Sequence, residues 1–261
     1  MKKRYILFLI LATWGLSTQA QTVINTEDLR LENSNKNFVG LVNFNFGMNE
    51  NKAGRFLKPN AKLRLEWIQQ KSKLMLLGGY RLTRFVPIND PDSAPRNFNS
   101  QGFSHLRFNQ DLNKKIVWEA FAQAQFDNVQ EIDQRYLVGT GPRFELLKTD
   151  SASLYLGTLY MYEYEETSAD IKVFNKHHRL SMYLNAGIQF NTSMGINNTS
   201  YFQPRPDVFS DFRIASVTQF FAQLNKHLSF NVNLDFVYDT RPPVTVPLRM
   251  YNFTAGLAWQ L

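Results

Sequence analysis

The last stretch of the chain, His227 to Leu261, reads HLSFNVNLDFVYDTRPPVTVPLRMYNFTAGLAWQL and decides the fold class. From Tyr251 to Leu261, every second residue is apolar or aromatic, and small or polar residues stand between them. The segment from Leu228 to Tyr238 repeats this alternation, broken only at Val237. A strict period of two predicts β-strands with one apolar face and one polar face. We predict that the last strand closes a membrane barrel by pairing with the first strand, around Phe38 to Met48.

The start of the chain has the organisation of an export signal. Residues 2–4 are basic, residues 5–16 are apolar except for Thr13 and Gly15, and small residues at Thr18 and Ala20 form a cleavage pattern. The apolar run is shorter than the roughly 18 residues expected of a membrane anchor. We therefore predict a signal peptide over residues 1–20, a polar periplasmic lead-in over 21–36, and the barrel over 37–261.

Composition excludes several classes of protein. The chain has 261 residues and no cysteine, so neither a disulfide framework nor thiolate chemistry is available to it. Its net charge of +7 includes three charges in the predicted signal peptide. The remaining basic residues are scattered and often neighbour acidic residues, so we expect no nucleic-acid partner. A length of this size suits one large all-β domain.

Twelve alternating segments follow the lead-in, and the ninth has the weakest pattern. They centre on residues 38–48, 63–67, 74–82, 105–109, 116–126, 136–146, 154–164, 180–190, 193–203, 212–224, 228–238 and 251–261. The fold class predicted from them is an all-β, antiparallel transmembrane β-barrel of about twelve strands, of the outer-membrane type. An even number of strands returns both ends of the barrel to the same side.

The connections between these segments alternate in length. Short polar turns are predicted at residues 70–73, 111–114, 148–151 and 225–226. Longer, irregular connections are predicted at 87–97, 128–133, 165–176, 203–210 and 240–247. Short periplasmic turns and long extracellular loops are typical of outer-membrane barrels. A soluble sandwich would show the same alternation within strands, but it explains neither the export signal nor this asymmetry.

The inward parity of the strands is polar and carries both signs of charge. The predicted lumen-lining residues are Arg64, Glu66, Arg81, Arg107, Glu119, Arg143, Glu145, Arg213 and Asp235. Bulky residues share this parity, namely Met75, Leu77, Phe121, Tyr155, Met161 and Tyr183. They predict a narrow bore, which is either occluded or open to small solutes. Trp and Tyr residues on the opposite parity are expected at the lipid interfaces.

Three segments carry a resemblance to a known family: Ser210 to Ile214 (SDFRI), Leu224 to Phe230 (LNKHLSF) and Tyr238 to Pro243 (YDTRPP). In these segments the chain resembles the family of salt-induced outer-membrane proteins catalogued as domain of unknown function 481. The resemblance implies a Gram-negative outer-membrane barrel and brings no catalytic residues with it.

The end of the chain also resembles the signal that the barrel-assembly machinery reads in outer-membrane proteins. The residues of this predicted assembly signal are Tyr251, Phe253, Leu257, Trp259 and Leu261. That signal most often ends in Phe or Trp, and Leu261 departs from this pattern. The partners expected from the sequence are outer-membrane lipid and the assembly machinery, and the barrel is expected to be monomeric.

The candidate catalytic and metal-binding residues are not spaced for catalysis or metal binding. A lipase needs a Ser next to a His base, but His178 and Ser181 differ by three positions and therefore face opposite sides of one strand. Adjacent His177 and His178 diverge in the same way and cannot chelate one metal. Glu163, Glu165, Glu166 and Asp170 crowd one strand end, where a solvated acidic loop tip is favoured over a Ca²⁺ site. We predict no catalytic, cofactor or metal site.

The function predicted from the sequence is that of a non-enzymatic outer-membrane barrel with a structural or envelope-stress role. A porin-like channel for small solutes is the main alternative, and an outer-membrane lipase is a further one.

Overall fold

The computed structural model describes residues 37–88, 94–168 and 172–259, and within them it contains twelve β-strands. The predicted signal peptide, the lead-in and Leu261 lie outside the described residues. The strands are β1 (Phe38–Asn51), β2 (Gly54–Ile68), β3 (Ser72–Pro87), β4 (Arg96–Asp111), β5 (Ile116–Asp127), β6 (Ile132–Lys148), β7 (Ala152–Thr167), β8 (Phe174–Asn191), β9 (Met194–Pro204), β10 (Phe212–Gln223), β11 (Leu228–Asp239) and β12 (Arg249–Trp259).

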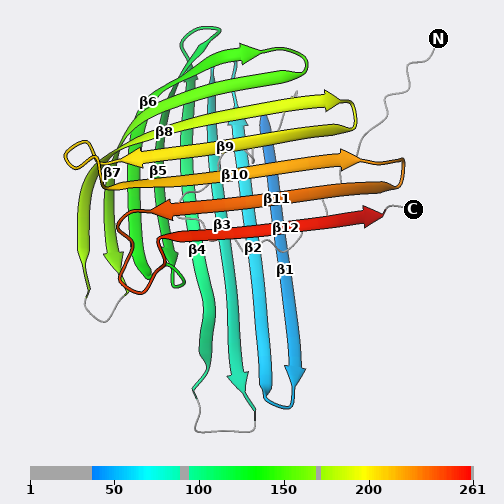
Figure 1. Ribbon diagram of the computed structural model, residues 1–261, viewed down its shortest axis with the longest axis vertical. Coiled ribbons are helices and arrows are strands. Elements are labelled where there is room, and N and C mark those ends of the chain that lie inside the picture. Colours follow the sequence, from blue (N-terminus) through cyan, green and yellow to red (C-terminus); the bar gives the residue numbers. More distant parts are fainter. Residues whose placement is uncertain (1–36, 89–93, 169–171, 260–261) are drawn as a thin grey trace.

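All twelve strands belong to one antiparallel sheet in which each strand pairs with its neighbours in the sequence, from β1 to β12 (Figure 1). The predicted fold class and the strand count are therefore confirmed, including the ninth strand. In the described part of the chain, no helix is long and apolar enough to cross a membrane. The first eight strands and β11 are longer than the alternating segments indicated, because alternation fades at strand ends while backbone pairing continues.

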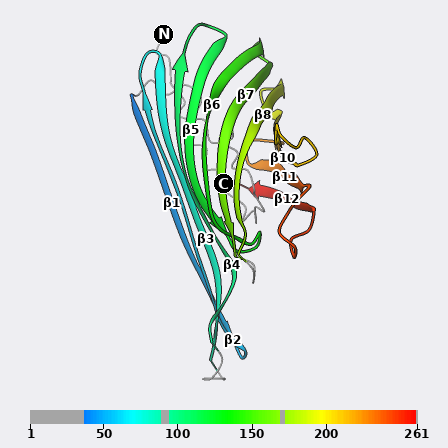
Figure 2. The same cartoon turned by 90° about the vertical axis from the view of Figure 1, so that its left-hand side faces the viewer.

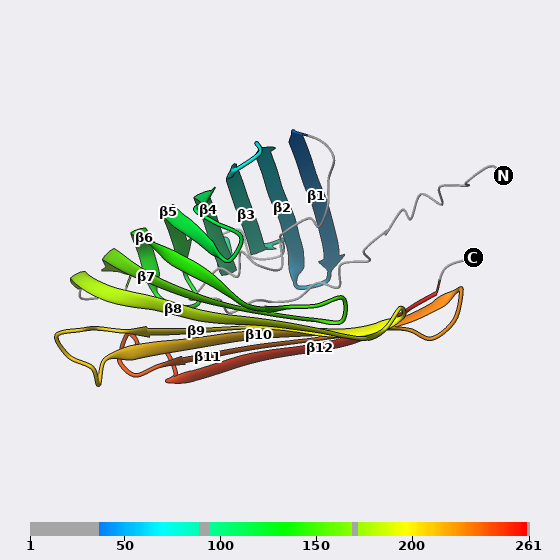
Figure 3. The same cartoon turned by 90° about the horizontal axis from the view of Figure 1, so that it is seen from above.

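The sheet twists and curls into a deep trough (Figures 1 and 2). Seen from above, β1–β3 form one wall, β8–β12 form the other, and β4–β7 join them at one side (Figure 3). Side chains from non-adjacent strands meet on the concave face, such as those of Arg213 on β10 and Glu163 on β7. The buried residues of the protein lie on this inner face, and large apolar side chains are exposed on the outer face.

The seam predicted between the last and first strands is not formed among the described residues. The strand β1 pairs with β2 alone and β12 pairs with β11 alone, so both are edge strands at opposite lips of the trough (Figure 3). Each observed pair joins strands that are consecutive in sequence and is therefore local. Closing the seam would join the two most distant strands and depends on the curvature of the whole sheet.

The connections follow the predicted asymmetry, except that the β5–β6 connection is no longer than two of the short turns and the β1–β2 connection is shorter still. Turns at one end of the sheet are short, spanning residues 69–71, 112–115, 149–151, 192–193 and 224–227. Connections at the other end span 88–95, 128–131, 168–173, 205–211 and 240–248, but the β1–β2 connection there is a two-residue turn, 52–53. Asparagines stabilise several short turns: Asn113 Oδ1, for example, accepts hydrogen bonds from the backbone N–H groups of Lys115 and Ile116, both at 2.9 Å.

Candidate functional site: the inner face of the sheet

The nine residues predicted to line a lumen all lie on the inward parity of their strands. Arg64, Glu66, Arg107, Glu119, Arg143, Arg213 and Asp235 are buried, whereas Arg81 and Glu145 are half-buried. Buried charges need partners, because an unpaired charge away from water is strongly destabilising. The pairing of these side chains therefore determines what the inner face can do.

At the long-loop end, eight charged residues form one connected group, which we call the arginine–carboxylate cluster. Its members are Arg135, Glu163, Glu165, Arg179, Arg205, Asp211, Arg213 and Asp239. Four are cationic and four are anionic, so the cluster is neutral as a unit. They come from β6, β7, β8, β10, β11 and the β9–β10 loop, so the cluster ties together five strands and one loop.

Arg213 is the centre of the cluster. Its Nη1 atom donates to both carboxylate oxygens of Glu163 at 2.8 Å, and its Nε atom donates to Asp239 Oδ2 at 2.6 Å. Its Nη2 atom lies 3.3 Å from Glu165 Oε2, and the same carboxylate accepts a 2.6 Å hydrogen bond from Arg135 Nε. A planar guanidinium can serve three carboxylates at once, which the point charge of a lysine cannot do with fixed geometry.

Arg179 extends the cluster to the β9–β10 loop. Its Nε atom lies 3.3 Å from Glu163 Oε2, and its Nη2 atom donates to Asp211 Oδ1 at 2.9 Å. Arg205 binds the other oxygen of Asp211 at 3.1 Å and also pairs with exposed Asp207. Burial alone would raise the pKa of the Asp211 carboxyl group, but the nearby guanidinium groups of Arg179 and Arg205 have the larger effect and lower this pKa below that of an ordinary aspartate. The loop is therefore held to the inner face by ion pairs.

The expectation of a solvated acidic tip at the end of β7 is wrong for Glu163 and Glu165. Both are buried, with exposed fractions of 0% and 2%. Their arginine partners lie on the two neighbouring strands, Arg135 on β6 and Arg179 on β8, and on the more distant β10, which carries Arg213. The local run of acidic residues gave no sign of this compensation. Glu166 does pair near the surface, with Lys172 at 2.6 Å. Asp170 lies outside the described residues.

Several cluster members were missed as lumen residues by the sequence analysis, namely Arg135, Arg179, Asp211 and Asp239. Arg135 and Arg179 share the inward parity of Arg143 and Tyr183, so extending the alternation toward the strand ends would have found them. Asp211 and Asp239 begin and end strands, where period two carries no information. Asp211, Arg213 and Asp239 belong to the segments that carry the family resemblance, and the structure brings these three into one cluster.

Toward the middle of the sheet, the inner face becomes apolar and aromatic. Its buried core is Leu159, Tyr183, Tyr201, Ala215 and Val237, with Phe121 and Met250 packed against it. The hydroxyl group of Tyr183 on β8 donates to Glu119 Oε2 on β5 at 2.7 Å and accepts from Arg107 Nη2 on β4 at 3.0 Å. Because β5 and β8 are not neighbours, this contact crosses the concave interior.

Gly157 makes room for this crossing, and its replacement by Ala is a direct test. A Cβ atom at Gly157 would overlap the ring of Tyr183, whose hydroxyl group is fixed by Glu119 and Arg107. We expect Gly157→Ala to lower the free energy of unfolding by about 1–3 kcal/mol, as overpacking does. Gly256→Ala is the matched control, since nothing lies within 4 Å of the added Cβ. Denaturant unfolding of both variants measures the difference, and equal stability would contradict the crossing.

Further pairs hold the polar residues of β2 to β5. Glu66 accepts from Arg64 Nε at 2.7 Å and pairs with Lys73 at 2.6 Å. His105 is buried, stacks on Phe121 and lies 2.8 Å through Nδ1 from Gln123 Oε1. In the opposite wall of the trough, Asp235 on β11 accepts a hydrogen bond from the side chain of Asn252 on β12 at 3.2 Å. These contacts give Glu66 cationic partners and give Asp235 an amide partner.

The outer face carries the opposite chemistry. Trp67, Trp118, Tyr136, Val138 and Tyr160 are all more than a third exposed. The described residues of the predicted assembly signal lie on this face, with exposed fractions of 77% for Tyr251, 60% for Phe253, 68% for Leu257 and 63% for Trp259. His178 is exposed and stacks on Tyr160, whereas Ser181 is buried, so the structure places them on opposite faces.

A twelve-stranded antiparallel meander, with a charge-paired inner face and an apolar outer face, defines an all-β protein of the β-barrel type. The chain belongs to the family described as "Protein of unknown function, DUF481", which matches residues 61–259. No curated protein matches the chain.

Two solved structures are similar in shape at low identity. The first, described as the NanC porin, has a TM-score of 0.46 and 8% identity, covering 86% of this chain and 98% of that one. The second, described as a bacterial polysaccharide outer membrane secretin, has a TM-score of 0.39 and 9% identity, covering 86% and 91%.

Proposed function

We propose that this protein is a non-enzymatic β-barrel of the Gram-negative outer membrane, monomeric, with a narrow bore that its own side chains occlude. The observation that carries the proposal is the reversal of polarity: ion pairs are buried inside and aromatic and aliphatic side chains are exposed outside. A water-soluble protein rarely exposes a continuous apolar surface of this kind, whereas lipid favours it.

Insertion into a membrane would favour closing the open seam between β1 and β12. The unpaired edges of β1 and β12 would leave backbone N–H and C=O groups without partners in the hydrocarbon region. Each such group costs several kcal/mol in lipid, so we propose that the two edges pair when the protein inserts. Because the sequence contains no cysteine, pairs of engineered cysteines on β1 and β12 offer a clean crosslinking test of this seam.

Occlusion is supported by the inner-face contacts between non-adjacent strands. The arginine–carboxylate cluster joins β7 to β10, and Tyr183 joins β8 to β4 and β5. Side chains that meet across the interior fill space that a solute would need. A structural or envelope-stress role is what the family resemblance implies for such a barrel. Its partners would be outer-membrane lipid and the barrel-assembly machinery, and no cofactor is required.

A passive channel for small solutes is the second candidate function, because the inner face carries many polar groups that could line a water-filled path. Single-channel recording in a planar bilayer separates the two. We expect no stable open steps from the wild-type protein, and open steps from a Phe121→Ala/Tyr183→Ala variant, which removes two rings from the interior. Stable open steps from the wild type would establish the channel and exclude the occluded bore.

Localisation and activity are tested separately. After outer-membrane extraction, we expect gel mobility that changes on heating, as for a folded barrel. Recovery of all the protein in the soluble periplasmic fraction would exclude the membrane proposal. The lipase alternative predicts that purified protein with Ca²⁺ releases fatty acid from phospholipid, and we expect none.

A further inference from the structure

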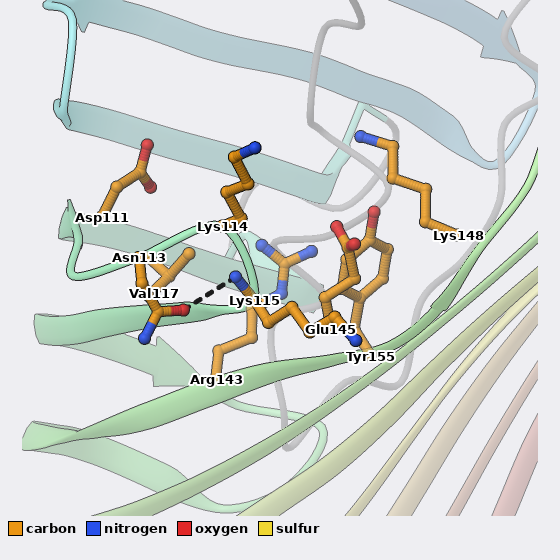
Figure 4. A pocket seen from close by; sticks show the side chains of 9 residues that line it. All are labelled: Asp111, Asn113, Lys114, Lys115, Val117, Arg143, Glu145, Lys148 and Tyr155. Atoms are coloured by element: carbon orange, nitrogen blue, oxygen red, sulfur yellow. Dashed lines mark hydrogen bonds between the residues drawn. The ribbon is translucent and has the colours of Figure 1, made fainter.

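The two ends of the trough differ. At the short-turn end, the inner face opens into a cavity of about 340 Å³ beside the β4–β5 turn, with Arg143 of β6 and Tyr155 of β7 in its lining (Figure 4). At the long-loop end, the β11–β12 connection, residues 240–248, reaches across to the β5–β6 connection. We call residues 240–248 the strap.

The strap is fixed at its base to β10 and to the arginine–carboxylate cluster. The Thr240 hydroxyl accepts a hydrogen bond from the Phe212 N–H group at 2.9 Å, and the Thr240 N–H group donates to the Phe212 carbonyl at 3.1 Å. Asp239 Oδ2 accepts from Arg213 Nε at 2.6 Å, and Asp239 Oδ1 accepts from the backbone N–H group of Arg241 at 2.9 Å. One carboxylate therefore joins the strap to the cluster.

The tip of the strap is a turn with one exposed side and one buried side. The Val246 N–H group donates to the Pro243 carbonyl at 3.0 Å, which closes a four-residue turn. Val244 is 99% exposed, whereas Val246 is 8% exposed. Between them, the Thr245 hydroxyl donates to Glu131 Oε1 in the β5–β6 connection. The turn therefore rests on the protein instead of extending into solvent.

Glu131 receives the strap and has an unusual backbone conformation. Its φ of 55° is the only positive value among the described residues, and side chains with a Cβ rarely adopt it. Strain of this kind persists where surrounding contacts enforce it, and it is common at switch segments. The Glu131 carbonyl also accepts from the Ser168 N–H group at 2.8 Å. Glu131 thus connects three long-loop connections: its own, the β7–β8 loop and the strap.

We infer that the strap is a lid over the arginine–carboxylate cluster and that the hydrogen bond between Thr245 and Glu131 is the latch that holds it closed. The cluster lies on β6 to β11, and the strap connects the two ends of that series of strands. Release of the latch lets the strap turn about its fixed base and admits water to the ion pairs. Pro242, Pro243 and Pro247 restrict its backbone, so the strap moves as a unit.

This inference rests on the proposed function only for its direction, because the long loops of an outer-membrane barrel face the outside of the cell. The lid then controls access to the cluster from that side.

Thiol labelling of the folded protein in detergent micelles tests the latch. The sequence has no cysteine, so Val246→Cys supplies one buried reporter and Val244→Cys one exposed reporter on the same turn. We expect a water-soluble maleimide to label the Val246→Cys protein at least about tenfold more slowly than the Val244→Cys protein, since a buried thiol reacts only after local opening. Adding Thr245→Val, which removes the hydroxyl donor, should accelerate labelling of the buried reporter at least about fivefold and change the exposed reporter less than about twofold.

Two further variants assign the effect to this one hydrogen bond. Thr245→Ser keeps a hydroxyl group and should leave the labelling rate of the buried reporter unchanged. Glu131→Gly removes the acceptor and suits a φ of 55°, so it should accelerate labelling as Thr245→Val does. The Thr245→Val/Glu131→Gly double variant should be no faster than either single variant, because both remove the same bond.

Hydrogen exchange followed by mass spectrometry tests whether the strap covers the cluster. The peptide of residues 205–213 contains Asp211 and Arg213 of the cluster. We expect it to exchange at least about threefold faster in Thr245→Val than in Thr245→Ser. A peptide of residues 112–118, at the short-turn end, should exchange equally in both variants.

Three results would overturn the inference. The first is equal labelling of the buried reporter in Thr245→Val and Thr245→Ser, and the second is an additive effect in the double variant. The third is faster labelling without faster exchange of residues 205–213, since the strap would then open without uncovering the cluster. These measurements need only the folded protein in micelles, so failure of the lid is distinguishable from failure of the membrane localisation or of the occluded bore.

Discussion

Replacing Arg213 by Met is expected to lower the free energy of unfolding by about 3–5 kcal/mol, the usual cost of removing one partner from a buried ion-pair group. Met has a similar length and no charge, so the loss is electrostatic more than steric. Among the described residues, the variant would leave Glu163 with one arginine at 3.3 Å and would remove the ion pair of Asp239. Both carboxylates would then have to remain charged with too few partners or bind protons.

Arg205→Met is the control for this change. Arg205 lies in the β9–β10 loop and is half-buried, and one of its two ion-pair partners, Asp207, is exposed to solvent. Exposed pairs contribute about 0–1 kcal/mol, and Asp211 would keep Arg179. Urea unfolding in lipid vesicles, followed by tryptophan fluorescence, measures both variants. If Arg213→Met and Arg205→Met were equally stable, the cluster would not be the electrostatic centre of the fold.

Replacing Val138 by Arg is expected to impair membrane insertion and to cost about 2–4 kcal/mol, as cationic residues do on the lipid face near the bilayer centre. Val138 lies on the outer face in the middle part of β6 and is 59% exposed. On the neighbouring strands it is paired with Ala122 and Tyr162. If this face met water, the same substitution would change stability by less than about 0.5 kcal/mol. The experiment therefore reports on the solvent of the outer face.

Val129→Arg supplies the comparison at a similar exposure. Val129 is 47% exposed in the 128–131 connection, beyond the ends of β5 and β6, where a charge would remain in water or among headgroups. We expect it to fold into vesicles with a cost of about 0–1 kcal/mol. Folding yield in vesicles, read as heat-modifiable gel mobility, measures both. Equal yields for the two variants would argue that the outer face is not in contact with lipid.

Most of the fold could be predicted from the sequence because alternate side chains of a β-strand lie on opposite faces of the sheet. The segments around Phe236 and Phe253 show this directly, since these two apolar side chains are exposed outside whereas the neighbouring Asp235 is buried inside. The inward parity of Arg64, Glu119 and Arg213 followed from the same rule. The strand ends were less visible, because Arg135 and Arg179 lie where the apolar alternation has faded.

The partners of the inner residues could not be predicted in this way. Glu163 and Glu165 look like an acidic strand end when read locally, and only the curl of the sheet brings Arg213 of β10 to them. The alternation of apolar and polar residues predicts which face of the sheet a side chain occupies. It does not predict which distant strand lies opposite that face.

The sequence alone determined that this protein is a twelve-stranded antiparallel sheet with opposite faces of opposite polarity, and that consecutive strands pair through turns. These features are local, because each depends on a strand and its immediate neighbour. The tertiary structure decided the curvature, and with it the neutral arginine–carboxylate cluster at one end and the Tyr183 crossing in the middle. Those features depend on contacts between strands that are not neighbours, and the twist of the whole sheet sets such contacts.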